Sequence, residues 1–206
     1  MSIGQKPSEL AHGALFLDHA LKNAFNREIL DRAENLGFSD WWLAAGCLAQ
    51  TVWNIQSGRA SEHGILDYDL FYFDPDTSWA TEDKVISKGT ELFADLPVTV
   101  EIRNQARVPI WYPEKFGIEY GVVAAASDGI DRFAYQTTAV GVRKVDAGSS
   151  IDAYRIYAPF GLDALINQRI VPNTRLPIRR VYEQKVARWK EIWPELDVLP
   201  WPEGDR

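Results

Sequence analysis

The chain has 206 residues, of which 46% are hydrophobic and 25% are charged, a composition typical of globular proteins and not of disordered or collagen-like chains. Its net charge of −7 argues against a generally basic nucleic-acid coat protein, and its single cysteine, Cys47, excludes an internal disulfide framework and a cysteine-rich zinc site. The longest apolar run, residues 41–53, is shorter than the roughly 20 residues of a membrane span, and the first residues lack a signal-peptide pattern, so we expect a cytoplasmic protein with no membrane partner.

The first third of the sequence predicts helices around one short strand. Apolar residues at helical spacing predict two helices within residues 1–36, which Gly37 ends. Residues 41–45 form a compact apolar run that predicts a buried strand ending at Gly46, and residues 48–56 return to helical spacing. Residues 1–37 are therefore the predicted N-terminal helical segment.

The middle of the chain alternates strands and helices. Residues 65–73 and 98–103 have strand patterns, and residues 81–96 between them form an amphipathic helix that Pro97 ends. Residues 104–120 are expected to be irregular, because they contain two prolines and a glycine (Pro109, Pro113 and Gly117).

The last third predicts a hairpin and further helices. Ser127 begins a predicted helix that runs to residue 133, and residues 139–143 and 151–157 pair as a hairpin. Residues 162–168 and 181–193 are predicted helices, and the aromatic side chains of the second are interpreted as core. The interleaving of elements predicts an α/β (α+β) class with a small mixed sheet. A core of residues 38–160 then carries a C-terminal helical segment, residues 161–206, packed on it.

The most informative pattern is Asp67-Tyr68-Asp69. Side chains alternate faces along a strand, so both aspartates project to one face, about 7 Å apart at Cα. On the next strand Glu101 lies on the polar face. Three acids on adjacent strands suit a site for two Mg²⁺ or Mn²⁺ ions, which favour carboxylate oxygens and substrate phosphates. The alternative is that the aspartates are exposed and paired with Arg59 or Arg103.

A small-residue turn precedes these acids. Leu43-Ala44-Ala45-Gly46-Cys47 has the pattern of a strand, a glycine turn and a helix start. Free N–H groups and the helix dipole make such a turn an anion site. Its Cys47 is interpreted as a buried small side chain and not as a nucleophile.

Together these features resemble the nucleotidyltransferase fold of the DNA polymerase β superfamily, whose signature is a Gly-Gly or Gly-Ser turn followed by D-x-D. More closely, the chain resembles a family of small bacterial nucleotidyltransferase-like proteins of unassigned substrate. The matching stretches run from about residue 38 to the end: W-W-L-A-A-G (41–46), D-Y-D-L-F-Y-F-D (67–74), R-N-Q-A-R-V (103–108), I-W-Y-P-E-K-F-G (110–117), A-V-G-V-R (139–143), A-P-F-G-L-D (158–163) and W-P-E-L-D-V-L-P-W (193–201).

The resemblance implies a minimal nucleotidyltransferase fold and a role for each matching residue. Asp67 and Asp69 match the metal-binding acids, Glu101 matches the third acid, and Gly46-Cys47 matches the turn that holds the nucleotide phosphates. The implied reaction is Mg²⁺-dependent transfer of a nucleoside monophosphate from an NTP to an unknown hydroxyl acceptor, with RNA and protein both open. Cys47 replaces the second Gly or Ser of the signature, and Pro109 stands where similar sequences carry His.

Further polar residues are candidates for the nucleotide. Arg107 is placed to clamp the triphosphate, and Asn104 or Gln105 to contact a base or ribose edge. The structural alternative is that the two amides cap a loop while Arg107 pairs with Glu101. Two other cations, Arg143 and Lys185, are candidates for neutralising phosphate charge.

Other functions remain open at this point. One is a catalytically silent nucleotide-binding or interaction protein that keeps the fold, which the departures at Cys47 and Pro109 favour. Another is a sugar-nucleotide glycosyltransferase, because such enzymes also use D-x-D with a divalent metal. A third is RNA binding through residues 169–190, which carry a local net charge of +6.

Overall fold

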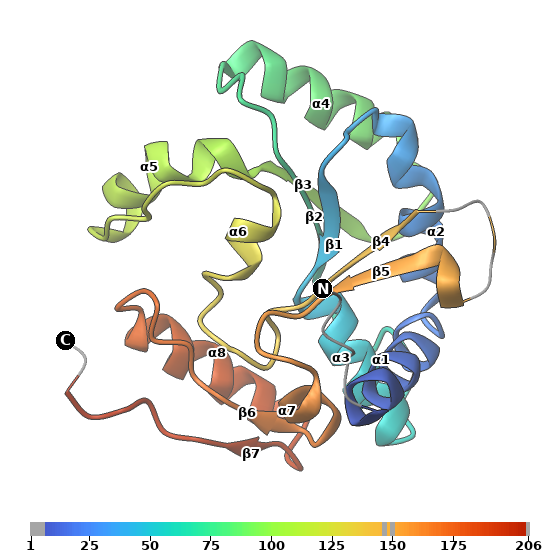
Figure 1. Cartoon of the computed structure of the whole chain (residues 1–206), viewed down its shortest axis with the longest axis vertical. Coiled ribbons are helices and arrows are strands. Elements are labelled where there is room, and N and C mark those ends of the chain that lie inside the picture. Colours follow the sequence, from blue (N-terminus) through green and yellow to red (C-terminus); the bar gives the residue numbers. More distant parts are fainter. Residues whose placement is uncertain (1–6, 146–147, 149–150, 205–206) are drawn as a thin grey trace.

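The computed structural model describes residues 7–145, 148 and 151–204, and it has a mixed α/β fold (Figure 1). One sheet has the strand order β3-β2-β1-β4-β5, with β1 (Trp41–Ala44), β2 (Asp67–Tyr72), β3 (Thr99–Asn104), β4 (Gly141–Lys144) and β5 (Tyr154–Tyr157). Strands β2 and β3 are parallel, and the other neighbours are antiparallel. The predicted α/β class with a small mixed sheet and flanking helices is confirmed. Residues 1–6 and 205–206 of the predicted terminal segments lie outside the described residues.

The N-terminal residues form two helices, as predicted, namely α1 (Pro7–Ala20) and α2 (Ala24–Arg32), followed by the 3-10 turn η1 (Ala33–Leu36). Asn23 begins α2, because its side-chain oxygen accepts hydrogen bonds from the N–H groups of Phe25 and Asn26. Gly37 ends η1 at a φ of 86°, a left-handed conformation that favours glycine.

Two helices connect the first three strands. Helix α3 (Gly46–Gln56) lies between β1 and β2, and α4 (Trp79–Leu92) lies between β2 and β3. Parallel strands need such a long crossover, so α4 permits the parallel pairing of β2 and β3. Ser78 caps α4, since its hydroxyl accepts a hydrogen bond from the N–H of Thr81.

The prediction that residues 104–120 are irregular is wrong. They form the 3-10 turn η2 (Gln105–Arg107) and the helix α5 (Val108–Phe116). Pro109 lies in the first turn of α5, where an N–H has no partner in the helix, so it is tolerated there. Pro113 removes one internal hydrogen bond, and Gly117 ends the helix with its N–H donating to the carbonyl of Pro113 at 2.8 Å. The two prolines therefore do not prevent residues 108–116 from forming a helix.

The C-terminal half contains the predicted hairpin and three helices. Strand β4 pairs antiparallel with β5, and the 3-10 turn η3 (Ile151–Ala153) precedes β5. Two predicted helices are single turns, α6 (Ser127–Ile130) and α7 (Asp163–Ile166), and the third is α8 (Arg179–Ile192). Strands β6 (Arg169–Ile170) and β7 (Asp197–Val198) form a second, parallel pair. The sequence did not predict this pair, because two residues are too few to show an alternating pattern.

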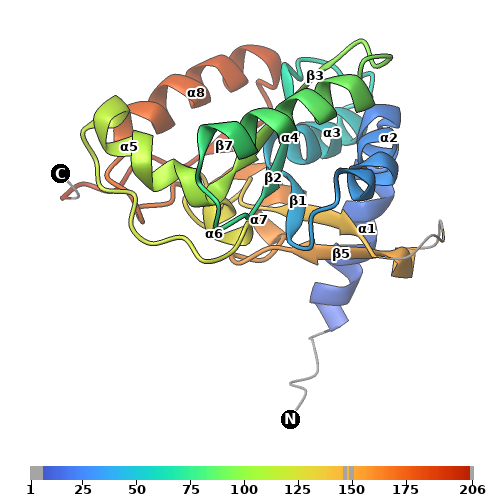
Figure 2. The same cartoon turned by 90° about the horizontal axis from the view of Figure 1, so that it is seen from above.

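The two faces of the main sheet have different environments. Tyr68, Leu70 and Tyr72 of β2 point into the main hydrophobic core. Helix α3 packs against β2 and helix α4 against β3 on this side of the sheet (Figure 2). Asp67, Asp69 and Phe71 alternate with them and so lie on the opposite face, where Phe71 packs in a smaller apolar cluster with residues of α6. The acids are therefore on the less covered face.

The C-terminal segment is joined to the rest of the molecule by tryptophans. The Trp53 ring of α3 contacts the rings of Trp189 and Trp193 at centroid distances of 5.3 and 5.6 Å. The indole N–H of Trp193 donates to Asn54 Oδ1 at 2.7 Å. These aromatic side chains are core, as the sequence predicts, and the core contains residues of all three predicted segments. Within the described part of the chain, no helix is both long and apolar enough to cross a membrane.

Candidate active site

The predicted acids meet at one level of the sheet. Asp69 on β2 is the register partner of Ala44 on β1 and of Glu101 on β3. Because Ala44 is followed directly by the turn into α3, that turn lies on one side of Asp69 and Glu101 lies on the other. The D-x-D strand, the third acid and the small-residue turn, which are far apart in sequence, are thus adjacent in the fold.

Asp67 and Asp69 have no polar partner among the residues that the structure describes. The alternative of pairing with Arg59 or Arg103 is not realised, because Arg59 binds Glu195 and Arg103 binds Glu101 at 2.8 Å. Two carboxylates on one partly buried face without a counter-ion are electrostatically unfavourable. A bound cation would reduce the repulsion between the two carboxylates.

The pKa of Asp69 reflects this lack of compensation. Burial, and next the negative charge of Asp67, raise the pKa of Asp69 to about 7, although the charge of Lys185 opposes the shift. Mg²⁺ is commonly bound by one or two carboxylates together with substrate phosphates. The donor set of Asp67 and Asp69 fits such an ion. Among the described residues no three carboxylates, imidazoles or thiols form a complete ligand set, and Glu101 would have to leave Arg103 to join one.

The turn before α3 has a strained backbone. Ala45 has a φ of 55° and a ψ of −109°, a conformation that is unusual for a residue with a side chain. A Cβ on Gly46 would lie 2.9 Å from Nε2 of Gln50, so the turn accommodates only glycine there without a shift of Gln50. The first N–H groups of α3 have no carbonyl partner within the helix. The turn can therefore present backbone donors beside the acids.

Cys47, the second residue of this turn, is buried. Its thiol donates a weak hydrogen bond to the carbonyl of Ala44 at 3.6 Å. Burial, and then the charges of Asp69 and Asp67, raise the pKa of the Cys47 thiol well above its ordinary value. The thiol stays protonated at neutral pH and is not a nucleophile, which agrees with the interpretation from the sequence.

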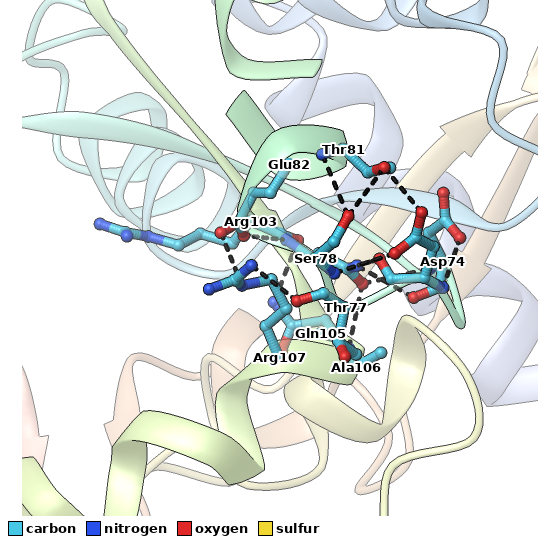
Figure 3. A network of polar contacts seen from close by, with 11 residues as sticks. Asp74, Thr77, Ser78, Thr81, Glu82, Arg103, Gln105, Ala106 and Arg107 are labelled. Atoms are coloured by element: carbon cyan, nitrogen blue, oxygen red, sulfur yellow. Dashed lines mark hydrogen bonds and ion pairs between the residues drawn. The ribbon is translucent and has the colours of Figure 1, made fainter. Parts of the chain in front are cut away.

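Arg107 is held by a structural network (Figure 3). Its guanidinium forms an ion pair with Glu82 of α4 at 2.8 Å, donates to the carbonyl of Thr77 at 2.7 Å and stacks on Trp79 at 4.0 Å from the ring centre. Its side chain is 4% exposed. Arg107 therefore forms a structural ion pair, but with Glu82 and not with Glu101, the partner that the structural alternative names.

Asn104 has a structural position as well. Its side-chain oxygen accepts hydrogen bonds from the N–H groups of Asp74 and Ala106, and its amide nitrogen donates to the carbonyl of Asp74 at 2.9 Å. These bonds join the end of β3 to the loop after β2. Both polar groups of the amide are used within the protein, so Asn104 is not free to contact a nucleotide.

The other candidate cations differ in their positions. Lys185 of α8 lies close enough to Asp69 to influence its pKa, and both residues line one cavity together with Gln105. Arg143 lies on β4, two strands from β2, with its guanidinium 4.9 Å from the ring centre of Trp42. Lys185 and Gln105 are therefore at the site, and Arg143 lies apart from it.

Part of the positive charge of residues 169–190 is compensated by acids. Arg169 pairs with Asp197, Arg175 with Asp131 and Arg179 with Glu183. Lys190 donates to two backbone carbonyls near the end of α8. Three of the seven basic residues thus pair with acids, and Glu183 is already counted in the local net charge of +6, so RNA binding through this stretch stays an alternative.

A cavity of about 270 Å³ adjoins Asp69. Its walls are mainly apolar and rich in aromatic side chains, among them Phe71, Trp111, Tyr112, Tyr120 and Phe133. The cavity was not predictable from the expected elements, since most of its rings come from residues 104–120, which were expected to be irregular. The spacing of Tyr112, Phe116 and Tyr120 at intervals of four residues is the signal that would have found it.

Comparisons with known proteins identify a family and a fold for the chain. A family model described as nucleotidyltransferase matches residues 31–198. A structure solved by NMR and described as a CCA-adding enzyme head domain is similar to this chain with a TM-score of 0.69 and 23% sequence identity, over 90% of this chain and 95% of the other. That likeness shows the fold, and no curated protein matches the chain. Because the family match covers most of the sequence, the protein belongs to the nucleotidyltransferase family.

Proposed function

We propose that the protein transfers a nucleoside monophosphate from an NTP to a hydroxyl acceptor and depends on Mg²⁺ or Mn²⁺. The observation that carries this proposal is the position of Asp67 and Asp69. Within the described ranges their side chains form no hydrogen bond or ion pair, and they lie on one face of β2 beside the strained turn before α3. Family membership supports nucleotidyl transfer in general, and the site suggests how this chain would perform it.

Each part of the site has a separate task in this proposal. Asp67 and Asp69 would hold the divalent cation, with Glu101 as a further ligand. The bound cation would neutralise charge on the triphosphate. The N–H groups of Gly46 and Cys47 would bind phosphate oxygens at the start of α3. Lys185 would add a positive charge from the C-terminal segment.

The reaction is a displacement at the α-phosphorus. The acceptor oxygen forms a bond to Pα, the bond from Pα to the bridging oxygen of the β-phosphate breaks, and pyrophosphate leaves with the electron pair of that bond. The hydroxyl proton passes to a carboxylate of the acidic face and then to water. The protein contributes position and charge compensation, the usual sources of catalysis in phosphoryl transfer.

Nucleotide binding is the first test. Labelled ATP, GTP, CTP and UTP are titrated with and without Mg²⁺ into the wild type, the double variant Asp67→Asn/Asp69→Asn, and Asp76→Asn, an exposed aspartate outside the site. We expect Mg²⁺-dependent binding of at least one NTP, weakened about tenfold or more in the double variant and unchanged in the control. Failure of every nucleotide to bind at millimolar concentration would contradict the proposal.

Catalysis needs a second measurement, because a silent nucleotide-binding protein would pass the first. Pyrophosphate release from the NTP that binds is followed after addition of a small-molecule extract of cells. We expect release with the wild type and none with Asp69→Asn. Binding without release would favour the silent alternative, for which the contact of Glu101 with Arg103 is the supporting observation.

A further inference from the structure

We propose that the acceptor is a small, planar, hydroxyl-bearing molecule that binds in the aromatic cavity beside Asp69. This inference rests on the proposed nucleotidyl transfer and adds the substrate class. It follows from three properties of the cavity, namely its place relative to the acids, the nature of its walls and the groups at its polar end.

The cavity lies on the side of Asp69 that faces away from the phosphate-binding turn. Its lining includes Phe71 of β2, Arg103 of β3 and residues of α5, α6 and α8, but no residue of β1 or α3. The turn at Gly46 follows β1, on the opposite side of β2 from β3. A triphosphate at the turn and a molecule in the cavity would therefore approach Asp69 from opposite sides, as the two reactants of a displacement must.

The walls favour a flat molecule. The rings of Phe71 and Phe133 are stacked at 5.6 Å, and the Tyr112 ring lies 4.6 Å from that of Tyr120 and 4.5 Å from that of Phe116. Rings of this kind bind planar groups by offset stacking and by edge contacts. A volume of about 270 Å³ accommodates one small ring system, which is at the lower limit of known ligand pockets. A folded RNA or a protein surface does not fit such a space.

The polar end of the cavity can orient a hydroxyl group. Asp69 lines the cavity together with Arg103 and Lys185, whose charges act on it, so charged groups meet the apolar walls at this acid. Gln105 also lines the cavity, and Arg132 lines it where its guanidinium donates to the carbonyls of Tyr120 and Val122. A ring in the cavity would direct an attached hydroxyl toward Asp69. The oxygen of that hydroxyl would then form the new bond to Pα, while pyrophosphate leaves on the turn side.

A nucleobase is also planar, so the test must distinguish the base of the NTP from a separate acceptor. The probes are 2-naphthol as a hydroxyl-bearing ring, naphthalene as its counterpart without the hydroxyl, and ATP with Mg²⁺. Binding of the ring probes is measured by saturation-transfer NMR, and binding of ATP by calorimetry. Both are repeated in the presence of the other ligand.

The main variant fills the cavity. Val181→Trp introduces a large ring at a lining position of α8 that is 38% exposed, so the fold can tolerate it. Val122→Trp is the matched control, since Val122 is 87% exposed and does not line the cavity. Tyr112→Leu is a second cavity variant, which removes a ring without filling the space. Circular dichroism verifies that each variant is folded.

We expect 2-naphthol to bind the wild type and Val122→Trp with equal affinity. Its affinity for Val181→Trp and for Tyr112→Leu should be lower by about tenfold or more. ATP with Mg²⁺ should bind all four proteins alike and should not displace 2-naphthol. With both ligands present, the wild type should form the adenylyl ester of 2-naphthol and pyrophosphate, while naphthalene should give no product.

The contrary outcomes separate this inference from the proposed function. If ATP displaces 2-naphthol and loses affinity in Val181→Trp, the cavity holds the nucleobase; the acceptor inference is then wrong and nucleotidyl transfer stands. If neither ring probe binds while ATP binds normally, the acceptor inference is likewise wrong and nucleotidyl transfer stands. If 2-naphthol binds but no NTP does, the proposed function fails and the acceptor assignment fails with it.

Discussion

Asp69 shows how ligand binding and folding oppose each other in one residue. Burial and the charge of Asp67 raise its pKa to about 7 from the ordinary 3.8, so the folded protein holds this proton more tightly than the unfolded chain does. The stability contributed by protonated Asp69 is therefore complete below about pH 4 and is lost as the pH rises through about 7. At higher pH without a cation, the ionised carboxylate destabilises the fold.

Asp69→Asn should relieve this cost, because the amide is neutral and similar in shape. We expect the free energy of unfolding in EDTA to rise by about 1–3 kcal/mol at about pH 8, and the gain to fall toward zero near pH 4. Urea denaturation at both pH values measures the difference. The same variant should lose Mg²⁺-dependent nucleotide binding.

Asp76→Asn is a matched control, for which the expected change in the free energy of unfolding has the opposite sign. Hydrogen bonds from the Thr81 hydroxyl and from the N–H of Ser78 lower the pKa of Asp76. Ionised Asp76 therefore contributes stability above its unfolded pKa, and its replacement should reduce stability at about pH 8. An Asp69→Asn variant that is less stable than the wild type at that pH would contradict the account of Asp69.

Among the elements, the ion pair of Arg107 with Glu82 joins η2 to α4. Both side chains are largely buried, with exposures of 4% and 12%. Removing one partner of a buried pair leaves the other charge without compensation, which costs more than the pair itself contributes. This contact therefore holds the end of β3 against α4, and its role is tested by its effect on stability.

Arg107→Met and Glu82→Gln should each lower the free energy of unfolding by about 2–4 kcal/mol, and the double variant should lose less than the sum of the two. Arg179→Met, which breaks the exposed pair with Glu183, should cost less than about 0.5 kcal/mol. Urea denaturation gives all four values. An Arg107→Met variant of unchanged stability and weakened NTP binding would show that Arg107 is a phosphate ligand instead.

Close packing joins α4 to the neighbouring strand. A Cβ on Gly89 of α4 would lie 2.0 Å from Cδ1 of Ile102 on β3, so any larger residue here would force the end of the Ile102 side chain, or the helix, to move. Alanine is the better helix former by about 1 kcal/mol, but it would compete for space with a buried side chain. Packing, and not helix propensity, therefore determines the residue at this position.

The prediction concerns the coupling between the two positions. Gly89→Ala should lower the free energy of unfolding. Ile102→Val removes the contacting methyl group, so it should lower the free energy of unfolding by about 1 kcal/mol less in the Gly89→Ala protein than in the wild type. Thr90→Ala, at an exposed position of the same helix, should be additive with Ile102→Val. Additive effects of Gly89→Ala and Ile102→Val would show that α4 shifts to accommodate the methyl group.

At the scale of the whole molecule, the C-terminal segment completes the site. Contacts between Trp53 and both Trp189 and Trp193 hold α8 against α3, and Lys185 on the same helix lines one cavity with Asp69 and lies close enough to influence its pKa. The charge that offsets the acids is thus supplied from a part of the chain more than a hundred residues away from them.

Lys185→Met should weaken Mg²⁺-dependent NTP binding by about tenfold, which corresponds to one lost charge-assisted contact, and should leave the unfolding free energy within about 1 kcal/mol of the wild type. Lys190→Met is the control on the same helix. The Lys190 ammonium donates to the carbonyls of Pro194 and Leu196, so its loss should reduce stability without changing nucleotide affinity. Equal NTP affinities of wild type and Lys185→Met would exclude a role for this lysine.

Features that depend on neighbouring residues were predictable from the sequence. Asp67 and Asp69 share a face because side chains alternate along a strand, and the turn at Gly46 follows from its small residues. The strand pattern of residues 98–103 placed Glu101 on the polar face. The elements were found where hydrophobic spacing was regular, and they were missed at α5, where Pro109 and Pro113 concealed a helical pattern.

The sequence by itself determined the alternating elements, the acidic strand and the glycine turn, because each is a consequence of chain geometry over a few residues. Only the tertiary structure decided that Arg107 pairs with Glu82, that Lys185 lines one cavity with Asp69, and that the rings of α5 form this cavity with Phe71 of β2 and with Phe133, which follows α6. These contacts join residues distant in sequence. Their formation depends on how helices and sheet pack together, and local spacing carries no information about that.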